Sequence, residues 1–387
     1  MKNLQGLCPR REDDSFFKRL PDSIRIYCVG GAVRDFLLGK NFTDKDFLLV
    51  GADLEHFKKY RLKAVGKNFP VFLHPETNEE LALARREKKH GIGYKGFIFF
   101  TGKDISLEED LKRRDLTINA MAVDELGNLH DPFQGMKDLS CKSLKHVHTA
   151  FVEDPLRLIR LGRFLSQLNG FSVHDSTYKL CRQMVKEGEI LTLSKERIWV
   201  ELAKGLKAQK PINMVNFLLD CGAWEQITGS SEFDKKLCGF LKNLEVSKVS
   251  LEWIAAAVFQ NFKVRNIHCK FPKAVVNAIT VLNKSRISRK KYIDKFSNQK
   301  SQCDLILDIF ETASLFRNPE NLDDFLYVSF FNHPEHKTLL TDCFKFLSKD
   351  SLKPVIDCNQ IRQAIKSEIR DYRLKRLKEF LITRIVS

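Results

Sequence analysis

Two short motifs near the N-terminus constrain the fold of this 387-residue chain more than any other feature. The first is a glycine pair at 30–31, which follows an apolar segment and precedes a helix expected over 32–38. The second is the pair Asp44 and Asp46, which directly precedes the apolar run 47–50. Because side chains alternate between the faces of a strand, carboxylates at i and i+2 share one face. The motifs predict a strand, a turn, a helix and a second strand that carries two carboxylates at its start.

This arrangement has the chemistry of a cation and phosphate site. Two fixed carboxylates supply the oxygen ligands that Mg²⁺ takes, and Mg²⁺ often shares its coordination with substrate phosphates. The glycines permit close backbone approach to a phosphate, and the N-terminus of a helix favours anions. Each motif alone is common in turns and at solvated strand starts. Their combination with Arg34 at short spacing favours the functional interpretation.

Charge and composition narrow the class of protein. The chain has 65 Lys and Arg against 49 Asp and Glu, a formal charge of +16, which indicates a polyanionic partner but does not specify one. It contains no run of about 18 or more apolar residues, so no membrane span is expected. The charged N-terminus has no apolar signal core, and the ten cysteines form no Cys-x-x-Cys pair. The composition therefore predicts a cytoplasmic protein with reduced thiols.

The pattern of apolar residues changes near residue 140. Strands are expected at 24–29, 47–50, 70–73, 81–86 and 120–123, and a loop at 91–94. Beyond about residue 142 the 3.6-residue helical period dominates, for example over 155–168 and 197–206. This predicts an α+β domain followed by a long helical region.

Two basic clusters occur in the helical region. One consists of Lys284, Arg286, Arg289, Lys290, Lys291 and Lys295, and the other of Arg370, Arg373, Lys375, Arg376 and Lys378. Such clusters are usually solvated helix faces. The overall charge makes contact with nucleic acid the sharper interpretation.

The pair Arg114 and Asp115 joins a donor to an acceptor. The guanidinium can bind phosphate or sugar oxygens, and the carboxylate can accept from a hydroxyl such as a ribose 2′-OH. The alternative is a local surface ion pair, which contributes little stability.

A third motif places Asp154, Arg157 and Arg160 at intervals of three residues, on one face of an expected helix. An Asp beside an Arg presents an acceptor beside a donor. Cytosine and adenine offer the complementary order on their pairing edges, whereas guanine and uracil offer the reverse. An unpaired buried polar group costs roughly 1–3 kcal/mol, so such a pair can accept C and A and reject G and U. The alternative is a capping carboxylate with an intrahelical salt bridge, and the sequence leaves both open.

These motifs together resemble a known family. The matching segments are 30–35 with 44–46, 113–115 with 119–120, 131–135, 153–157, and 196–199 with Glu201. In order and spacing they are similar to the class II tRNA nucleotidyltransferases, the CCA-adding enzymes of the polymerase-β nucleotidyltransferase superfamily. Bacterial poly(A) polymerases share the same head. The resemblance covers about residues 24–222 and is weak beyond them.

The resemblance implies an α+β fold in which a polymerase-β-like nucleotidyltransferase head precedes an all-α neck, body and tail. The implied boundaries are 1–23 for an N-terminal extension, 24–140 for the head, 141–206 for the neck with its base-reading helix, 207–275 for the body and 276–387 for a tRNA-binding tail. Some bacterial relatives carry a His-Asp phosphohydrolase domain. None is expected here, because the corresponding position reads Val-Phe-Gln-Asn over 258–261.

The resemblance also assigns roles. Asp44 and Asp46 would hold Mg²⁺, which activates the tRNA 3′-hydroxyl and neutralises the triphosphate. The implied nucleotide-binding residues are Gly31, Arg34, Arg114, Asp115, Asp154, Arg157 and Arg160. Asp131 and Gly135 would form the hinge between head and neck, and Glu153, Glu196 and Arg197 would support the base-reading helix.

The expected function is template-independent addition of C, C and A to the tRNA 3′ end from CTP and ATP. One alternative is a poly(A) polymerase, or an enzyme limited to CC or A addition. The lack of a basic Gly-Arg-Arg-Phe-type segment favours CCA addition, and the segment 85–94 is expected to govern the switch from C to A. A second alternative is a non-catalytic RNA-binding protein, against which the intact carboxylates and arginines argue.

Overall fold

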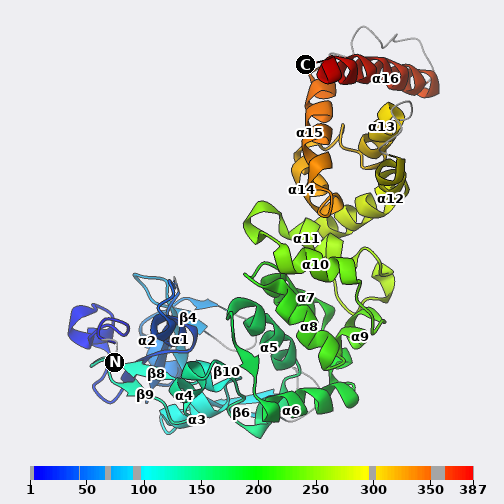
Figure 1. The fold of residues 1–387 in the computed structure, drawn as a ribbon. Helices are drawn as coiled ribbons and strands as arrows, with labels where there is room; N and C mark the ends of the chain where they lie inside the picture. Colours follow the sequence, from blue (N-terminus) through cyan, green and yellow to red (C-terminus); the bar gives the residue numbers. More distant parts are fainter. Residues whose placement is uncertain are drawn as a thin grey trace. The chain divides into compact units, whose positions relative to one another are not determined.

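The computed structural model describes residues 4–42, 44–65, 71–89, 97–295, 302–349 and 362–386 (Figure 1). The chain divides into two compact units. The first comprises Met1–Glu201 and Asn213–Ile227, and the second comprises Leu202–Ile212 and Thr228–Ser387. Strands are confined to the first unit within the described residues, and the second is built of helices, which confirms the predicted fold class. The boundaries expected at residues 140, 206 and 275 stay predictions.

The first unit is organised around a seven-stranded mixed sheet with the order β3-β4-β5-β2-β1-β8-β9. Its strands are β1 (Arg25–Val29), β2 (Asp46–Val50), β3 (Ala64–Val65), β4 (Val71–Leu73), β5 (Glu80–Leu83), β8 (Ala122–Asp124) and β9 (Leu129–His130). Two further pairs are β6 (Arg85–Lys89) with β7 (Phe97–Thr101), and β10 (Ser143–Leu144) with β11 (Ser172–Val173).

The prediction of a single strand over 81–86 is wrong, because this range contains parts of two strands, β5 and β6. β5 follows β2 in parallel up to the pair Leu49 and Leu83, and β2 ends one residue later. Without a partner strand to continue along, the chain leaves the sheet after Ala84 and pairs as β6 with β7. The loop expected at 91–94 and residue 70 of the expected strand 70–73 lie outside the described residues.

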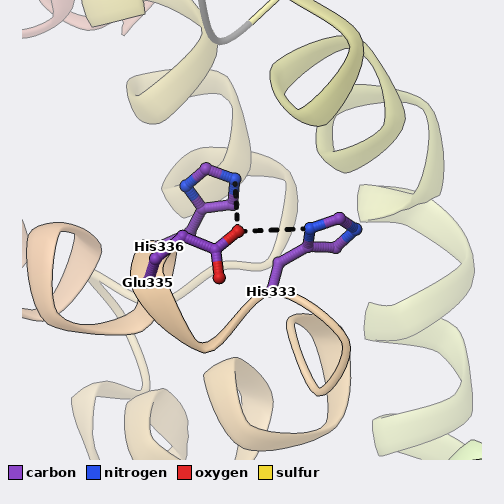
Figure 2. A group of neighbouring side chains, drawn as sticks. All are labelled: His333, Glu335 and His336. Carbon is purple, nitrogen blue, oxygen red and sulfur yellow. Dashed lines mark hydrogen bonds and ion pairs between the residues drawn. The ribbon is translucent and has the colours of Figure 1, made fainter.

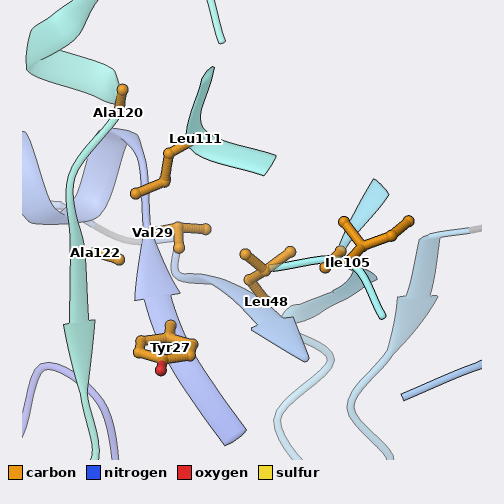
Figure 3. Packing of buried hydrophobic residues seen from close by; sticks show 8 residues of the cluster. Tyr27, Val29, Leu48, Ile105, Leu111, Ala120 and Ala122 are labelled. Atoms are coloured by element: carbon orange, nitrogen blue, oxygen red, sulfur yellow. The ribbon is translucent and has the colours of Figure 1, made fainter. Parts of the chain in front are cut away.

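One face of this sheet forms the core beneath the site. Tyr27 and Val29, two residues apart on β1, project to the same side as Leu48 of β2 (Figure 3). Leu111 of α3 (Leu107–Lys112) and Ala120, which follows the short helix η4 (Thr117–Asn119), close over them (Figure 3). Buried apolar contacts thus fix to the sheet the segment that carries Arg113 and Arg114.

The N-terminal extension packs against the opposite face of the sheet. Phe17, fully buried, meets Phe47 of β2 edge to face with ring centroids 5.5 Å apart. Asp14 lies 3.2 Å from Nε2 of the buried His74. In residues 4–23 the predicted extension is therefore part of the first unit.

The helices begin and end as follows: α1 Gly31–Leu38, α2 Leu54–Lys59, α3 Leu107–Lys112, α4 Gly135–Ser140, α5 Leu156–Gln167, α6 Asp175–Lys186, α7 Lys195–Leu206, α8 Pro211–Asp220, α9 Ala223–Thr228, α10 Lys235–Asn243, α11 Leu251–Phe259, α12 Lys273–Lys295, α13 Gln302–Thr312, α14 Leu322–Ser329, α15 Pro334–Ser348 and α16 Arg362–Val386. The helices expected at 32–38, 155–168 and 197–206 correspond to α1, α5 and α7. None of the described helices combines the length and the apolar character needed to cross a membrane.

In the second unit, the basic cluster near the C-terminus takes part in helix packing. Arg370 pairs with Asp308 of α13 at 2.7 Å, and the guanidinium of Arg373 lies 3.5 Å from the ring centroid of Phe316. These contacts attach α16 to the rest of the unit. In the other cluster, on α12, the exposed residues include Lys284, Arg286, Lys290 and Lys291.

Candidate active site

The carboxylate end of the site lies at one edge of the sheet. β1 ends at Val29, and its antiparallel partner β2 begins at Asp46. On the other side of β2, the parallel pairing sets Glu80 of β5 beside Asp46. Paired residues of neighbouring strands project to the same face, so two carboxylates from two strands meet at this edge. Only Asp46 was predicted from the sequence.

Asp44 lies outside the strand, which corrects the expectation that both aspartates share one strand face. The reason is the neighbouring strand. β1 makes its last pair through Val29, and the chain then turns at Gly30, whose φ of 75° lies in the left-handed region. β1 thus offers no partner beyond Asp46, and β2 cannot extend back to Asp44. Asp44 is exposed at the approach to the strand.

The charges at this end are mutually unfavourable. Burial raises the pKa of Asp46, Arg114 opposes the shift, and the charge of Asp44 adds to it. Burial likewise raises the pKa of Glu80, and the charges of Asp46 and Asp44 add to that shift. Asp46 still has an accessible side chain, so the protein crowds these carboxylates without enclosing them. A divalent cation fits this donor set, because it would remove the repulsion between the ionised groups.

The glycine turn brings basic groups close to the backbone. A Cβ on Gly30 would lie 2.9 Å from Nη1 of Arg114, so glycine satisfies both the positive φ and the close approach. Helix α1 starts at Gly31, and on its first turn Arg34 donates to Oδ1 of Asn119 at 2.6 Å. Arg34 also pairs with Asp35 at 2.8 Å. The predicted phosphate-binding residues are therefore held in place before any ligand binds.

Asp110 anchors the next two arginines. Its fully buried carboxylate accepts from Nη2 of Arg113 at 2.7 Å and from Nη2 of Arg114 at 3.2 Å. Burial alone would raise the pKa of Asp110, but the two arginine charges outweigh it and hold the pKa below its ordinary value. Asp110 therefore remains ionised and fixes both guanidinium groups.

Asp115 is the centre of a second buried network. Its Oδ2 accepts from Nε and Nη2 of Arg160 at 2.9 and 2.8 Å. Its Oδ1 accepts from the backbone N–H of Leu116 at 2.8 Å and from the amide of Asn119 at 3.0 Å. Burial would raise the pKa of Asp115, but the charge of Arg160 and the hydrogen bond from Asn119 hold it well below its usual range. The four contacts match the roughly four acceptor positions of a carboxylate.

The helix expected to read bases carries the predicted residues at its start. Asp154 directly precedes the first turn of α5 and accepts from the N–H of Leu156 at 3.2 Å, as in the capping interpretation. Among the described residues its ion-pair partner is Arg197 of α7 at 3.2 Å, in place of the intrahelical salt bridge to Arg157. Arg157 instead donates to the backbone carbonyls of Ala150 and Arg113, at 2.9 and 2.6 Å.

A buried ion pair joins α5 to α7. Glu201, 4% exposed, accepts from Nε of Arg163 at 2.6 Å and lies 3.8 Å from Nη1 of Arg160. The guanidinium of Arg163 also lies 4.2 Å from the ring centroid of Phe164. Burial lowers the pKa of Arg163, and the charge of Glu201 opposes that shift. This pair fixes the orientation of the helix that carries Asp154 and Arg157.

Many of these groups surround one cavity of about 610 Å³. Nine predicted residues line it: Gly31, Arg34, Asp46, Arg114, Asp115, Asp154, Arg157, Arg160 and Arg197. Of the described residues in its wall, eight are arginines and four are Asp or Glu. The cavity has an acidic end at the strand edge and a basic wall elsewhere, which suits a polyanion bound next to a cation.

Five predicted residues are not among the described residues that line the cavity: Asp44, Asp131, Gly135, Glu153 and Glu196. Asp131 caps α4, because its carboxylate accepts from the N–H groups of Gly135 and Met136 at 2.6 and 2.9 Å. A Cβ on Gly135 would lie 2.4 Å from the carbonyl oxygen of Thr117. The expected hinge is thus a short helix packed closely against the turn η4.

No role is predicted from the sequence for four residues of the cavity and its support: Glu80, Asp110, Arg163 and Glu201. Glu80 had a usable signal, since it directly precedes an expected strand. Glu201 occurs at i+4 from Arg197 on an expected helix, which places both on one face. Asp110 lies three and four residues before its partners Arg113 and Arg114. Arg163 lies on the helix expected at 155–168, but its partner Glu201 is 38 residues away.

Two family models match parts of the chain. The "Poly A polymerase head domain" matches residues 26–145, and the "Probable RNA and SrmB- binding site of polymerase A" matches residues 170–233. The first region contains most of the sheet, with Asp46 and Glu80, and also Asp115. The segment between the two matches contains the start of α5 with Asp154 and Arg157.

Curated relatives match about half of the chain. The "Multifunctional CCA protein" of Leptothrix cholodnii is 54% identical over 200 residues, which is 52% of this chain and 48% of the relative. The "CCA-adding enzyme" of Bordetella pertussis is 50% identical over 204 residues, or 53% of this chain and 56% of the relative. The chain thus spans about half the length of the curated relatives it matches.

Solved structures extend the likeness in fold to nearly the whole chain. The Thermotoga maritima CCA-adding enzyme in complex with tRNA has a TM-score of 0.65 at 18% identity, over 93% of this chain and 91% of the other. A CCA-adding enzyme in complex with ATP has a TM-score of 0.68 at 19% identity, over 92% and 86%. Residues 26–145 and 170–233 thus match a head domain and an RNA-binding region of poly(A) polymerases, and nearly the whole chain shares the fold of CCA-adding enzymes of known structure.

Proposed function

We propose that this protein is a nucleotidyltransferase that adds C, C and A to the 3′ end of tRNA from CTP and ATP. One observation carries the proposal: a single cavity is lined by Asp46 and Glu80 at the sheet edge and by Asp154 and Arg157 of the α5 segment. The first pair can serve phosphoryl chemistry, and the second can read a base. The relatives named for CCA addition support the choice of substrate.

Asp44, Asp46 and Glu80 would hold a divalent cation, for which we propose Mg²⁺. Carboxylate oxygens are the ligands that Mg²⁺ prefers, and the site leaves room for substrate phosphates. A cation bound there supplies charge neutralisation at the attacking and leaving oxygens of an in-line displacement. Asp46 and Glu80 contribute a rigid pair of ligands, because the register of β2 and β5 fixes their separation.

Gly31, Arg34 and Arg114 would bind the triphosphate. Gly31 begins α1, and its backbone N–H together with the positive end of the helix dipole favours an anion. Arg34 and Arg114 are already fixed by Asn119 and Asp110, so ligand binding need not order them. Charge-assisted hydrogen bonds from guanidinium groups to phosphate are among the strongest in proteins.

Asp115 acts chiefly by positioning Arg160. Its four acceptor positions are already used, so contact with a ribose hydroxyl requires one N–H of Arg160 to be released. The hydroxyl would then replace the released N–H, and the guanidinium would gain a donor for the nucleotide. This exchange gives Asp115 a part in selecting ribose.

Asp154 and Arg157 would read the base. Arg157 donates two of its five N–H groups to backbone carbonyls, which fixes the guanidinium and leaves further N–H groups for a ligand. Arg197 holds Asp154 as an acceptor, with Glu153 and Glu196 as neighbours in sequence. An acceptor beside a donor matches C and A, whereas G and U would leave buried groups unpaired at roughly 1–3 kcal/mol each.

The decisive test supplies the purified full chain with tRNA that lacks its 3′ CCA and with labelled nucleotides. With CTP alone we expect two C residues, with CTP and ATP a single CCA end, and with UTP or GTP no incorporation. Long A tracts without C would identify a poly(A) polymerase instead. RNA binding without diphosphate release would identify a non-catalytic protein. We place the activity in the cytoplasm, where the nine described cysteines would keep their free thiols.

A further inference from the structure

A second group of metal-ligating side chains lies in the second unit, at the start of α15. His333 precedes this helix, and Glu335 and His336 lie in its first turn (Figure 2). One atom from each residue, an imidazole nitrogen or a carboxylate oxygen, lies within 4.8 Å of the other two. The proposed nucleotidyl transfer makes no use of this cluster.

The spacing of the three donors fits a small tetrahedral ion. Oε1 of Glu335 lies 3.4 Å from Nδ1 of His333 and 3.6 Å from Nε2 of His336 (Figure 2). Zn²⁺ binds imidazole nitrogen and carboxylate oxygen at about 2.0–2.2 Å, which corresponds to ligand separations of about 3.3–3.6 Å along a tetrahedron edge. Both donor pairs therefore lie at the separation that a shared Zn²⁺ would require, with little rearrangement of the backbone.

The surroundings fix one ligand and leave two accessible. His336 is 5% exposed, and the ring of Tyr292 from α12 meets it edge to face with centroids 5.2 Å apart. The ring of His333 lies 5.6 Å from that of His336 at an interplanar angle of 28°. The side chains of His333 and Glu335 are 38% and 58% exposed. An ion can therefore approach from solvent and meet a pre-oriented imidazole.

An ordinary explanation exists for each pair alone. A glutamate in the first turn of a helix is favoured by the helix dipole, and a histidine beside it makes a weak surface ion pair. That explanation does not require two imidazole nitrogens to converge on the same carboxylate oxygen. It also does not require one of the two rings to be buried.

We propose that His333, Glu335 and His336 bind one divalent transition-metal ion, preferentially Zn²⁺, which fixes the start of α15. Two imidazoles with one carboxylate suit Zn²⁺ and related ions, whereas Mg²⁺ prefers sites made of oxygen ligands alone. Water would complete the coordination on the exposed side. Because His336 packs on Tyr292, the ion would also stabilise the contact between α15 and α12.

The test uses the full chain after removal of metals by a chelator, with a phosphine reductant to keep the thiols reduced. Zn²⁺ binding is measured by titration calorimetry, and Co²⁺ serves as a spectroscopic probe of the ligand type. His333→Gln and Glu335→Gln alter exposed side chains, so both variants should fold. His130→Gln is the matched control, because its side chain is also 38% exposed and pairs with one carboxylate, Asp124, at 3.0 Å.

The wild-type chain and His130→Gln should bind one Zn²⁺ in excess Mg²⁺, with a tetrahedral Co²⁺ spectrum free of thiolate charge-transfer bands. His333→Gln and Glu335→Gln should each weaken the affinity at least about tenfold, since even outer-shell changes cost about 10–100-fold. Equal affinity in these variants and in the control would overturn the proposal. So would a Co²⁺ spectrum dominated by thiolate, or displacement of Zn²⁺ by Mg²⁺.

Discussion

Carboxyl groups in two parts of the cavity have pKa values shifted in opposite directions. At the sheet edge, Asp46 and Glu80 are crowded together with Asp44, and burial raises the pKa of both cavity carboxyls. Elsewhere in the wall, Asp115 is more deeply buried, yet Arg160 and Asn119 hold its pKa well below the usual range. Burial acts in the same direction on all of them. The neighbouring charges and hydrogen bonds therefore decide whether the pKa of each carboxyl is raised or lowered.

The difference separates what stabilises the fold from what prepares the chemistry. A carboxyl whose folded pKa is lowered adds stability above its unfolded pKa of about 3.9, and this stability is lost as the pH falls toward the folded value. A carboxyl whose folded pKa is raised costs stability above that folded value, and the cost disappears below about pH 3.9. Asp115 therefore stabilises the first unit, whereas Asp46 costs stability until a cation binds.

Asp46→Asn gives the largest expected effect on activity. Loss of a charged cation ligand should reduce nucleotide incorporation at least about 10³-fold, since a metal ion stabilises the transition state by several kcal/mol. The same change should raise the melting temperature, because it removes an unfavourable charge. Rates of labelled CTP incorporation and calorimetric melting check both, with Asp104→Asn on the surface as control. A lower melting temperature would contradict the contrast between the two parts of the cavity.

Asp115→Asn should have the opposite effect on stability. Breaking the buried pair with Arg160 leaves that guanidinium only the more distant carboxylate of Glu201, at 3.8 Å, and should cost about 3 kcal/mol of unfolding free energy at neutral pH. The loss relative to wild type should shrink as the pH falls below about 3.9. Urea unfolding followed by circular dichroism at several pH values measures it. The exposed carboxylate of Asp22, which lies 3.9 Å from Arg11, provides a control that should change little.

Glu80→Gln tests whether the acidic end extends beyond the aspartates. Gln keeps the shape of the side chain but loses the charge, so we expect activity at low Mg²⁺ to fall about 10–100-fold and to recover in part at high Mg²⁺. The measurement is the incorporation rate as a function of Mg²⁺ concentration. Glu79→Gln, one residue earlier, should leave this dependence unchanged. An unchanged Mg²⁺ dependence for Glu80→Gln would restrict the cation site to the two aspartates.

Asp154→Asn should produce the smallest effect of the four changes. It should alter the selectivity between nucleotides and not the rate of incorporation. An amide can present either its carbonyl or its amino group, so it no longer rejects the reversed order of donor and acceptor in G and U. We expect discrimination against UTP and GTP to fall about tenfold. Competition between nucleotides measures this, with Asp175→Asn at the start of α6 as control. Unchanged selectivity would mean that another residue reads the base.

Local sequence signals correctly predicted one strand of the acidic end of the cavity, the strand β2 that begins at Asp46. Gly30, Asp46 and the apolar run 47–50 predicted the turn and strand correctly, because each depends on neighbours within a few residues. The position of Asp44 was wrong, because the start of β2 depends on where β1 stops pairing. Glu80 was missed, because its closeness to Asp46 depends on a pairing between strands far apart in sequence.

The basic residues show the same limit. The arginines of α16 were grouped as a candidate nucleic-acid surface, but Arg370 and Arg373 contact Asp308 and Phe316 within the second unit. In the first unit, Asp154 pairs with Arg197, 43 residues away, in place of the nearer Arg157. Composition and spacing give the number of charges. They do not give their partners.

The sequence by itself determined the α+β head with its helical continuation, the glycine turn, and nine of the residues that line the cavity. These follow from short-range periodicity and from motifs whose chemistry is local. Only the tertiary structure decided which carboxylates are crowded and which are neutralised, because the pKa of each group depends on burial and on charges brought from distant segments. It also brought His333, Glu335 and His336 within 4.8 Å of one another, with His336 packed against Tyr292 of a distant helix.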